Sequence, residues 1–457
     1  MDRWAEQNLA GWGRYPTVSG LATRPERRAD VKSALLDRED APILAFGLGR
    51  SYGDAALIRN GRAILTRRLD RIIDFDPKTA WLRCEAGVSI KELIDLFVPR
   101  GFFPPVVPGT QFVTLGGALA NDIHGKNHHV DGTFADHVRR VEILTASGEI
   151  VTCDAQEEPA LFWATVGGLG LTGVILAMDL KLCPIANPLI EMESVRVENL
   201  DHFFEVNAES SSFTHTVSWI DSVTTGQSLG RGIYMRGQHA VEGTPEAPSI
   251  LNKAAAAISP VLDVPIDGPA WLMNNLTMRA FNIAYFRKHP KGTVSTVTHY
   301  EPFFFPLDFV RNWNRIYGKR GMLQYQLVVP HDPEHLAIRE VLDTVTQAGM
   351  ASFLSVIKEF GDDVHSGLSF PAPGVTLALD FPNRGQTLLD MLDRLDSIVA
   401  AAGGRVYLGK DARLSRATFQ RMYPEWETWK EVRDTWDPDM VFQSDLGLRL
   451  GLVGAGT

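Results

Sequence analysis

The sequence contains little cysteine. Cys84, Cys153 and Cys183 are the only thiols among 457 residues, and they are widely spaced. An odd number of scattered cysteines supports neither a disulfide framework nor a zinc site. We therefore expect free, buried thiols in a reducing compartment.

Long apolar runs are also absent. No segment reaches the roughly 18 uncharged apolar residues that a membrane-spanning helix needs. The first residues, MDRWAEQNLAGWGRYP, lack the apolar core of a secretory signal. These absences predict a cytoplasmic protein, or one held at the periphery of the inner membrane.

An excess of positive charge is missing as well. The chain carries 55 acidic and 45 basic residues, which gives a net charge of -10. This balance argues against a broad nucleic-acid-binding surface, although FRKHPKG (286–292) forms a local basic patch. The length and the hydrophobic fraction of 45% are typical of a globular protein with two domains.

Strands and helices are expected to alternate over the N-terminal part of the chain. Ser89 and Glu92 form the spacing of a capping box ahead of an amphipathic helix. The segment 139–154 predicts a hairpin that turns at 147–148. After about residue 187 the loops lengthen, and after about residue 404 the pattern of the N-terminal part returns. This order predicts a cofactor domain interrupted by an inserted middle domain.

Three glycine-rich segments stand in the first domain. GLGRSYGDAAL (47–57) follows an expected strand, and its glycines let successive N–H groups curl around a phosphate. In VVPGTQFVTLGGALAND, Thr114 can cap a helix of small residues. GLGLTG (168–173) matches a dinucleotide-binding pattern, but a helix precedes it and a strand follows, the reverse of a Rossmann unit. Together the segments favour an extended dinucleotide.

These segments resemble the FAD-binding domain of the vanillyl-alcohol-oxidase superfamily. More narrowly, they resemble the decaprenylphosphoryl-ribose 2-oxidases, and the resemblance extends through WNRIYGKRGMLQYQLVVP, FLSVIKEFG and RVYLGKDAR over nearly the whole chain. It implies an α+β fold of the PCMH type with a cap domain built on an antiparallel sheet. The expected parts are an FAD-binding domain (1–187), a cap (188–403) and a C-terminal return (404–457).

The resemblance and the glycine segments together predict the cofactor site. We expect FAD to be bound non-covalently, because the first loop has no histidine to which a flavin could be attached. The predicted cofactor-binding residues are Gly47, Gly49, Arg50, Ser51, Tyr52, Gly53, Pro108, Gly109, Thr114, Gly116, Gly117, Asn121, His124, Gly125, Gly170, Thr172, Gly173 and Tyr407.

The stretch NDIHGKNHH (121–129) contains three histidines. A metal site is disfavoured, because Gly125 and the expected turn separate His124 from His128 and no carboxylate cluster adjoins them. His128 and His129 are open to a second interpretation, in which they only satisfy backbone groups. The resemblance instead places His124 against the flavin and Lys126 at the substrate pocket.

Three segments of the middle domain alternate polar and apolar residues. LQYQL (323–327), VIKEF (356–360) and VTLALDF (375–381) each predict a strand with one polar face. That face is either wet or it roofs a sugar- and phosphate-binding pocket. The resemblance favours the pocket and implies catalytic roles for Lys410, His124 and Tyr52. The predicted substrate-binding residues are Lys126, Gln324, Gln326, Lys358, Phe360, Thr376, Ala378 and Lys410.

Two positions depart from the mycobacterial members of the family. Those members carry cysteine where this chain has Ala378, and asparagine where it has Thr376. Covalent inhibitors attach to that cysteine in them, so a thiol is not needed for hydride transfer if alanine serves here. The same departures leave the exact lipid and sugar open.

The segment 249–292 combines apolar residues with a basic end. Trp271, Leu272, Met273 and Phe281 precede RKHPK. Contact with a polyprenyl phosphate or a membrane surface and a mobile surface loop are both open interpretations.

The resulting hypothesis is an FAD-dependent oxidase of a polyprenyl-phosphoryl pentose. It converts the 2-hydroxyl of the ribose to a ketone, and a separate NAD(P)H-dependent keto-reductase then makes the arabinose donor for cell-envelope glycans. One rival is a soluble aldonolactone or alditol oxidase of the same superfamily. A second is a flavin-free glycolipid-binding protein that keeps the fold.

Overall fold

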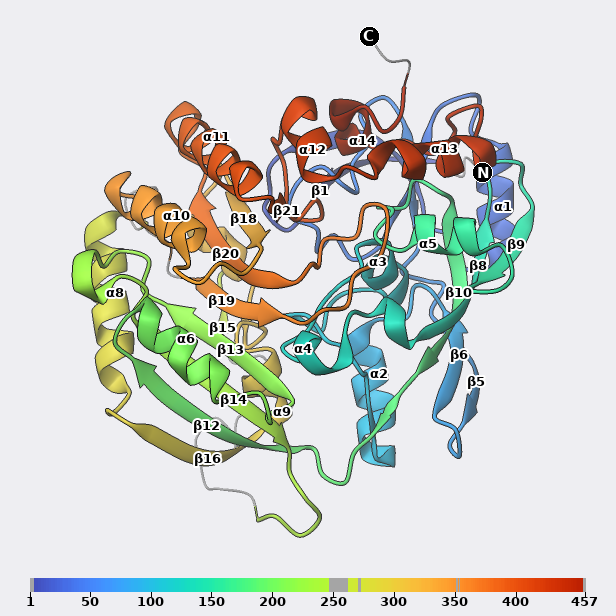
Figure 1. Ribbon diagram of the computed structural model, residues 1–457. Coiled ribbons are helices and arrows are strands. Elements are labelled where there is room, and N and C mark those ends of the chain that lie inside the picture. Colours follow the sequence, from blue (N-terminus) through green and yellow to red (C-terminus); the bar gives the residue numbers. More distant parts are fainter. Residues whose placement is uncertain (1–3, 246–261, 270–272, 351, 353, 455–457) are drawn as a thin grey trace.

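The computed structural model describes residues 4–245, 262–269, 273–350, 352 and 354–454. Figure 1 shows the N-terminal strands and the C-terminal helices on one side of the molecule and a large sheet with its own helices on the other. Helices and sheets are mixed in the way that the α+β prediction requires, and the prediction is confirmed.

The N-terminal part contains two larger sheets and a two-stranded one. Of the larger two, one has the order β1-β2-β4-β3 and the other has the order β5-β6-β10-β8-β9. Their strands are β1 (Ala5–Ala10), β2 (Thr17–Thr23), β3 (Ile43–Phe46), β4 (Arg62–Leu65), β5 (Ile72–Asp76), β6 (Trp81–Glu85), β8 (Val138–Leu144), β9 (Ile150–Asp154) and β10 (Val174–Lys181). The helices are α1 (Arg28–Leu36), α2 (Ile90–Phe97), α3 (Leu115–Ala120), α4 (His128–Asp131) and α5 (Pro159–Thr165), and β7 (Phe102–Phe103) pairs with β11 (Cys183–Pro184).

Local signals in this part predict the structure well. The Ser89 and Glu92 side chains form the expected capping box at the start of α2. Thr114 caps α3 by accepting a hydrogen bond from the Gly117 N–H group. The hairpin β8–β9 and the helix-then-strand order around residues 168–173 are also as predicted. Cys84 and Cys153 are buried, but Cys183 is exposed because it lies in the short strand β11, so the prediction of a buried thiol is wrong there.

The middle of the chain forms an eight-stranded sheet of order β16-β12-β14-β13-β19-β20-β18-β21. The register between β18 and β20 sets Gln324 opposite Asp380 and Gln326 opposite Ala378. The strands are β12 (Leu189–Val197), β13 (His215–Ile220), β14 (Gly232–His239), β16 (Thr293–His299), β18 (Met322–Val329), β19 (Ser355–Phe360), β20 (Gly374–Pro382) and β21 (Arg405–Val406). A small parallel pair joins β15 (Leu262–Asp263) to β17 (Val310–Arg311).

Helices cover one face of this sheet. Leu323, Tyr325 and Leu327 of β18 belong to a hydrophobic core that includes residues of α6 and α11. Each fully buried side chain of this kind stabilises the fold by about 1.5–3 kcal/mol. The helices of this part are α6 (Leu200–Ala208), α8 (Asn275–Lys288), α9 (Tyr300–Phe304), α10 (Leu336–Gln347) and α11 (Gln386–Ala401).

The C-terminal segment returns to the N-terminal part. The Ile43 N–H group donates to the Val441 carbonyl, and the Trp429 indole donates to the Ala164 carbonyl. Arg449 pairs with Asp54 at 2.7 Å. The helices are α12 (Arg416–Met422), α13 (Trp426–Trp436) and α14 (Asp445–Leu450). These contacts fix the loop before α12, which carries Lys410, against the first glycine segment.

Candidate active site

The first glycine segment is fixed where it meets the C-terminal return. The Tyr52 N–H group donates to the Gly409 carbonyl at 3.1 Å. A Cβ atom on Gly53 would lie 1.7 Å from the Asp411 carbonyl oxygen, so only glycine fits. In contrast, the N–H groups of 49–51 donate to no other group within the described part of the chain, and these residues are half-buried. Free N–H groups in an accessible loop suit a phosphate.

The second glycine segment packs against its own domain on one side and is accessible to a ligand on the other. Gly116 packs closely, because a Cβ atom there would lie 3.0 Å from that of Ala86. Gly117 is half-buried and would place its Cβ near only the Thr114 hydroxyl. Pro108 is half-buried, and Gly109 is exposed with open space around it. These placements leave one side of α3 and the preceding turn accessible to a ligand.

The third segment and the residue before it are hydrogen bonded to α3. The Gly167 N–H group donates to the Leu119 carbonyl, and the Leu169 N–H group donates to the Ala120 carbonyl at the end of the helix. Thr172 is fully buried, and its hydroxyl lies 2.9 Å from that of Thr165. Gly173 faces the Ile143 side chain, whereas Gly170 stays half-buried. The structure therefore gives Thr172 and Gly173 a packing role, while their predicted cofactor contacts stay predictions.

The segments converge at Asn121. Its side-chain amide donates to the Gly117 carbonyl at 2.8 Å, and its oxygen lies 3.5 Å from the Ser51 hydroxyl. The Tyr407 hydroxyl donates to the Asn121 backbone carbonyl at 2.8 Å, and a Cβ atom on Gly409 would meet the Asn121 side chain at 2.4 Å. A strip of accessible backbone thus runs between the first glycine segment and α3, and it fits an extended dinucleotide such as FAD.

Two of the three histidines in 121–129 satisfy backbone groups. His128 accepts a hydrogen bond from the Gly361 N–H group at 3.1 Å, and His129 Nε2 lies 2.9 Å from the Phe213 carbonyl oxygen. One ring nitrogen of each residue therefore meets a backbone group, while His128 Nε2 and His129 Nδ1 are buried without a partner among the described residues. Among the described residues, no group of three His, Cys, Asp or Glu side chains is placed to hold a metal ion.

His124 differs from its two neighbours. The Gln326 amide nitrogen lies 2.9 Å from His124 Nε2, so a neutral ring accepts there and carries its proton on Nδ1. Nδ1 is buried and has no partner among the described residues. The ring is surrounded by Phe360, Phe370 and Tyr407 at centroid distances of 4.8–5.6 Å. Burial, with the nearby Lys358 charge, holds its pKa well below the usual value.

The polar face of the eight-stranded sheet is not wet. Gln326, Thr376 and Asp380 are buried, which excludes the solvated-face interpretation. Ala378 and Gln324 on the same face keep some accessible surface. The Lys358 ammonium donates to the Gly125 carbonyl, and the Gln326 amide donates to the Thr376 hydroxyl at 3.4 Å. This face therefore lies against the FAD-binding part.

Three lysines bring positive charge to the junction, the place where the polar face of the eight-stranded sheet meets the FAD-binding part. Each keeps some accessible surface, yet desolvation by the surrounding protein is the largest cause of its pKa shift. The pKa falls to about 7 for Lys126 and Lys358 and to about 8 for Lys410. Lys410 Nζ lies 4.1 Å from the centre of the Tyr52 ring. Lys126 is already engaged, since it donates to the Phe303 and Phe304 carbonyls of α9 at 2.8 and 3.2 Å.

Two carboxyl groups at the site were not among the predicted residues. Asp380 is fully buried beside Gln324, whose amide donates to it at 2.5 Å. Asp308 accepts from the Gln111 N–H group at 2.9 Å and acts electrostatically on Arg50, which stacks on Trp12 at 4.1 Å. Strand alternation places Asp380 on the polar face, but nothing local in the sequence points to Asp308.

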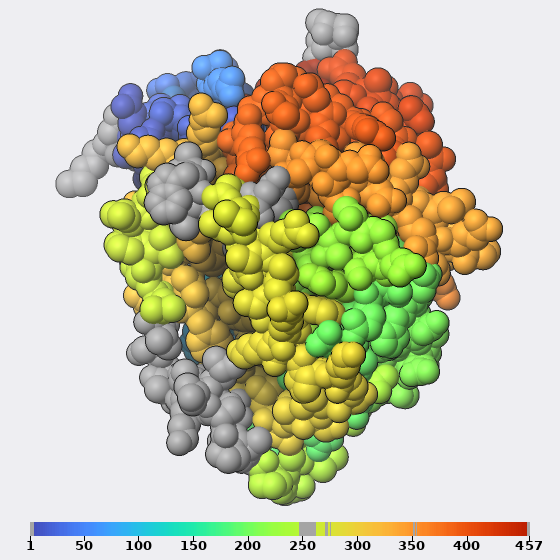
Figure 2. Space-filling model, turned by 90° about the vertical axis from the view of Figure 1, so that its left-hand side faces the viewer, coloured from blue at the N-terminus to red at the C-terminus, as the bar shows by residue number. Residues whose placement is uncertain are grey.

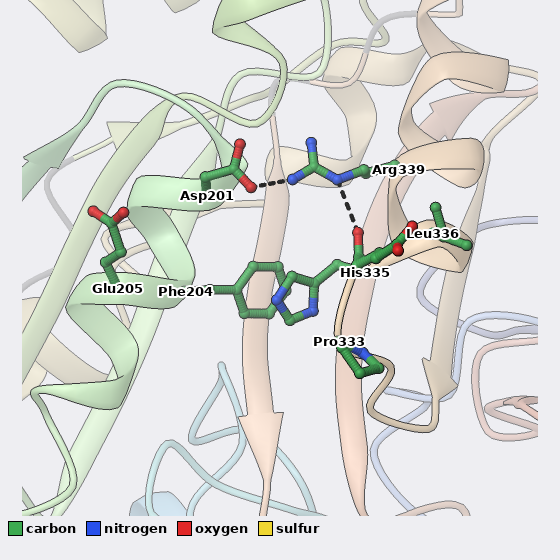
Figure 3. Close-up of a pocket in the computed structure, with 8 residues that line it drawn as sticks. Asp201, Phe204, Glu205, Pro333, His335, Leu336 and Arg339 are labelled. Atoms are coloured by element: carbon green, nitrogen blue, oxygen red, sulfur yellow. Dashed lines mark hydrogen bonds and ion pairs between the residues drawn. The ribbon is translucent and has the colours of Figure 1, made fainter.

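A separate surface hollow lies between α6 and α10. Figure 3 shows the Phe204 ring against His335, with centroids 3.4 Å apart, and the Arg339–Asp201 pair. The hollow has a volume of about 520 Å³, but none of the predicted site residues lines it. We place the active site at the junction and not here, because within the described part of the chain the junction combines free N–H groups, lysines and buried carboxyls.

Two family models match this chain. Residues 21–154 match the model described as an FAD binding domain, and this range contains the first two glycine segments. Residues 381–449 match the model of D-arabinono-1,4-lactone oxidase.

A relative matches the chain over almost its whole length. Decaprenylphosphoryl-beta-D-ribose oxidase of Mycolicibacterium smegmatis is 37% identical over 456 residues, which is 98% of this chain and 98% of the relative. The chain belongs to the decaprenylphosphoryl-beta-D-ribose oxidase family. An uncharacterized protein of Streptomyces coelicolor is 36% identical over 80% of this chain and 100% of its own length. Cytokinin dehydrogenase 8 of Oryza sativa is 29% identical over 35% of this chain.

Membership of this oxidase family settles the class of the protein. It is an FAD-dependent oxidoreductase, as the glycine segments and the resemblance predicted. The residues described above fit the cofactor through the free N–H groups of 49–51 and the accessible side of α3.

Proposed function

We propose that this protein oxidises the 2-hydroxyl of a polyprenyl-phosphoryl-D-ribose to the 2-keto sugar. The observation that carries the proposal is the junction itself, where the Gln326, Lys358 and Asp380 face of the sheet meets His124 of the FAD-binding part. Amides suit sugar hydroxyls, and lysines suit a phosphate. The relative with 37% identity carries the corresponding name.

The residues at the junction have distinct expected roles. Bound FAD supplies the acceptor for the hydride that leaves the sugar carbon. Gln324, Gln326 and Thr376 orient the sugar, while Lys358 provides positive charge. Lys410, whose pKa is lowered to about 8 by burial, is placed to take the hydroxyl proton. Tyr52 and His124 are expected to contact the sugar beside the reacting carbon.

Anaerobic mixing tests this function directly. The holoenzyme mixed with polyprenyl-phosphoryl ribose is expected to lose its oxidised-flavin absorbance in a single turnover, with the 2-keto sugar as product. Aldonolactones and alditols serve as the comparison substrates. No bleaching with the lipid-linked sugar, together with rapid bleaching and peroxide release with a soluble one, would reject the proposal.

The rival function has one specific observation in its favour. The D-arabinono-1,4-lactone oxidase model matches residues 381–449. That range begins at the end of β20 and includes Lys410, but it contains neither β18 nor β19. It therefore leaves out Gln326 and Lys358, and the near-full-length relative favours the lipid-linked sugar.

A keto-reductase partner completes the proposed reaction. Reduction of the 2-keto sugar on the opposite face gives the arabinose epimer and needs a hydride donor, for which the family resemblance implies a nicotinamide. We propose a separate NAD(P)H-dependent reductase. Product analysis with this protein alone should stop at the ketone; arabinose epimer formed without a second enzyme would contradict the need for a partner.

FAD is expected to be held without a covalent bond. The first glycine segment reads Gly49-Arg50-Ser51-Tyr52 and offers no histidine for attachment. Acid precipitation of the purified yellow protein should therefore release all of its flavin into the supernatant, measured by absorbance. Flavin that remains with the pellet after washing would show a covalent link.

Ala378 predicts resistance to thiol-directed nitroaromatic inhibitors. It lies on the polar face of β20, opposite Gln326, and keeps some accessible surface. Intact-mass spectrometry should show no adduct after turnover with such a compound, whereas Ala378→Cys should gain one adduct per chain. The matched control is Ala337→Cys, which is also half-buried but lies on α10, away from His124. An adduct on the unmodified chain near this position would contradict the prediction.

Membrane contact is proposed for the described part of 249–292. Trp271 and Leu272 lie outside the described residues and Met273 is buried, but 275–288 form α8 and not a loop. In Figure 2, α8 (yellow) lies on the surface. Leu276 and Phe281 are 78% and 49% exposed, and its last turn carries Arg287 and Lys288. Exposed apolar groups beside cations suit an anionic lipid surface.

A sedimentation assay with anionic liposomes tests this contact. We expect the protein to co-sediment at low salt and to be released at high salt. The double variant Leu276→Glu/Phe281→Glu should lose binding at least tenfold, because two charges would enter the apolar layer. Leu336→Glu, at a 60% exposed position on α10, is the matched control and should bind normally. Equal binding by both variants would remove α8 from the contact.

The described helices include none with the length and hydrophobicity that spanning a bilayer requires.

A further inference from the structure

Asp380 is the carboxyl group that the proposed reaction has not yet used. It is fully buried, and it lies on the same face of β20 as Thr376 and Ala378. The Gln324 amide donates to its Oδ1, and the Asp380 N–H group donates to the Ser352 hydroxyl at 3.0 Å. Its Oδ2 atom has no hydrogen-bond partner among the described residues. A buried carboxylate oxygen without a donor is costly unless another group uses it.

The groups around Asp380 are all capable of proton transfer. Lys410 Nζ lies 4.1 Å from the centre of the Tyr52 ring, and Tyr52 hydrogen bonds to Gln324, the same side chain that donates to Asp380. Lys410, Tyr52 and Asp380 therefore belong to one cluster. Burial raises the pKa of Asp380 to about 7 and lowers that of Lys410 to about 8, so both groups titrate in the neutral range.

We propose that Asp380 is a positioning residue that receives the substrate proton through Lys410. The inference rests on the proposed function. In the step, the sugar O–H bond breaks and its proton goes to the neutral amine of Lys410, and one proton of the resulting ammonium ends on Asp380 Oδ2. The carbon–hydrogen bond breaks with its electron pair, which leaves as hydride to the bound flavin, and the carbon–oxygen bond becomes a carbonyl. The pair, and not Lys410 alone, is then the base.

Asp380→Asn separates this role from a structural one, because it keeps the shape and removes only the charge and the proton acceptor. Loss of the neighbouring negative charge must lower the pKa of Lys410. Competitive amine labelling of the holoenzyme across a pH series, read by mass spectrometry at Lys410, should show that shift as at least about one pH unit. This readout needs neither substrate nor turnover. Asp343→Asn is the matched control, because this half-buried residue lies on α10, which packs on the opposite face of the sheet.

Flavin reduction by the lipid-linked sugar gives the second readout. Asp380→Asn makes Lys410 more neutral at pH 7.5, so a base acting alone would become faster. We expect the reverse, a reduction rate at least tenfold lower with normal flavin content. An unchanged labelling curve, or a rate that is equal or higher, would overturn the proposal.

The reciprocal variant covers the case in which Asp380→Asn does not fold. In Lys410→Met holoenzyme, infrared difference spectra should show that the carboxyl of Asp380 protonates at higher pH than in the wild type, since a cation has been removed. No shift would contradict the coupling. If the wild type is not bleached by the sugar at all, the proposed function fails, whereas the labelling result still decides the Asp380–Lys410 pair.

Discussion

Lys410→Ala is expected to keep its flavin and to lose flavin reduction by substrate by about 10²–10⁴-fold, the usual contribution of a general base. The reason is the position of the amine. It lies deep at the junction, 4.1 Å from the centre of the Tyr52 ring, and burial lowers its pKa to about 8. A substantial neutral fraction is therefore present at neutral pH, where an ordinary lysine would be fully charged.

Anaerobic stopped-flow absorbance measures this loss. Flavin content per chain is determined in the same samples, so that a binding defect is not read as a chemical one. Lys319→Ala, at an exposed position before β18, is the matched control and should react at the wild-type rate. A Lys410→Ala protein that is reduced within threefold of the wild-type rate would remove Lys410 from the reaction.

Gly53→Ala has the second large expected effect. The new methyl carbon would lie 1.7 Å from the Asp411 carbonyl oxygen, and neither a Cβ atom nor a backbone oxygen can turn aside by a side-chain rotation. The first glycine segment must then move away from the C-terminal return, which displaces Tyr52 and the free N–H groups of 49–51. We expect the free energy of unfolding to fall by about 1–3 kcal/mol or more and most of the protein to purify without flavin.

Gly20→Ala, in β2 and outside the predicted site, is the comparison for that variant. A Cβ atom at Gly20 would meet only the Gly61 carbonyl oxygen at 3.5 Å, an ordinary contact, so this protein should bind flavin and melt like the wild type. Flavin content is read from absorbance and stability from thermal unfolding. If Gly53→Ala retained full flavin and an unchanged melting temperature, the fit between the first segment and the C-terminal return would not matter for the cofactor.

Several features of the site were predictable because their causes are local. A side chain that caps its own helix, such as Ser89 or Thr114, needs only residues within one turn. The alternation in β18 likewise fixes which residues share a face before their partners are known. The resemblance added the identity of the cofactor, which no local pattern specifies.

Other features depend on residues far apart in the chain. Asp308 meets the Gln111 N–H group across 197 positions, and Lys126 reaches the α9 carbonyls instead of lying free in the pocket. The sequence could not show whether the polar face was wet, since that depends on what covers it. The same holds for the histidines, because only packing separates His124 from the backbone-bound His128 and His129.

The sequence by itself determined the capped helices α2 and α3, the alternating strands of the polar face, the three glycine segments and the family. Only the tertiary structure decided that the sheet face is covered, that Thr172 and Gly173 serve packing, and that a buried carboxyl stands near Lys410. The physical reason is range. Hydrogen bonds within one turn are encoded by neighbours, whereas desolvation and charge coupling depend on every segment that folds around a group.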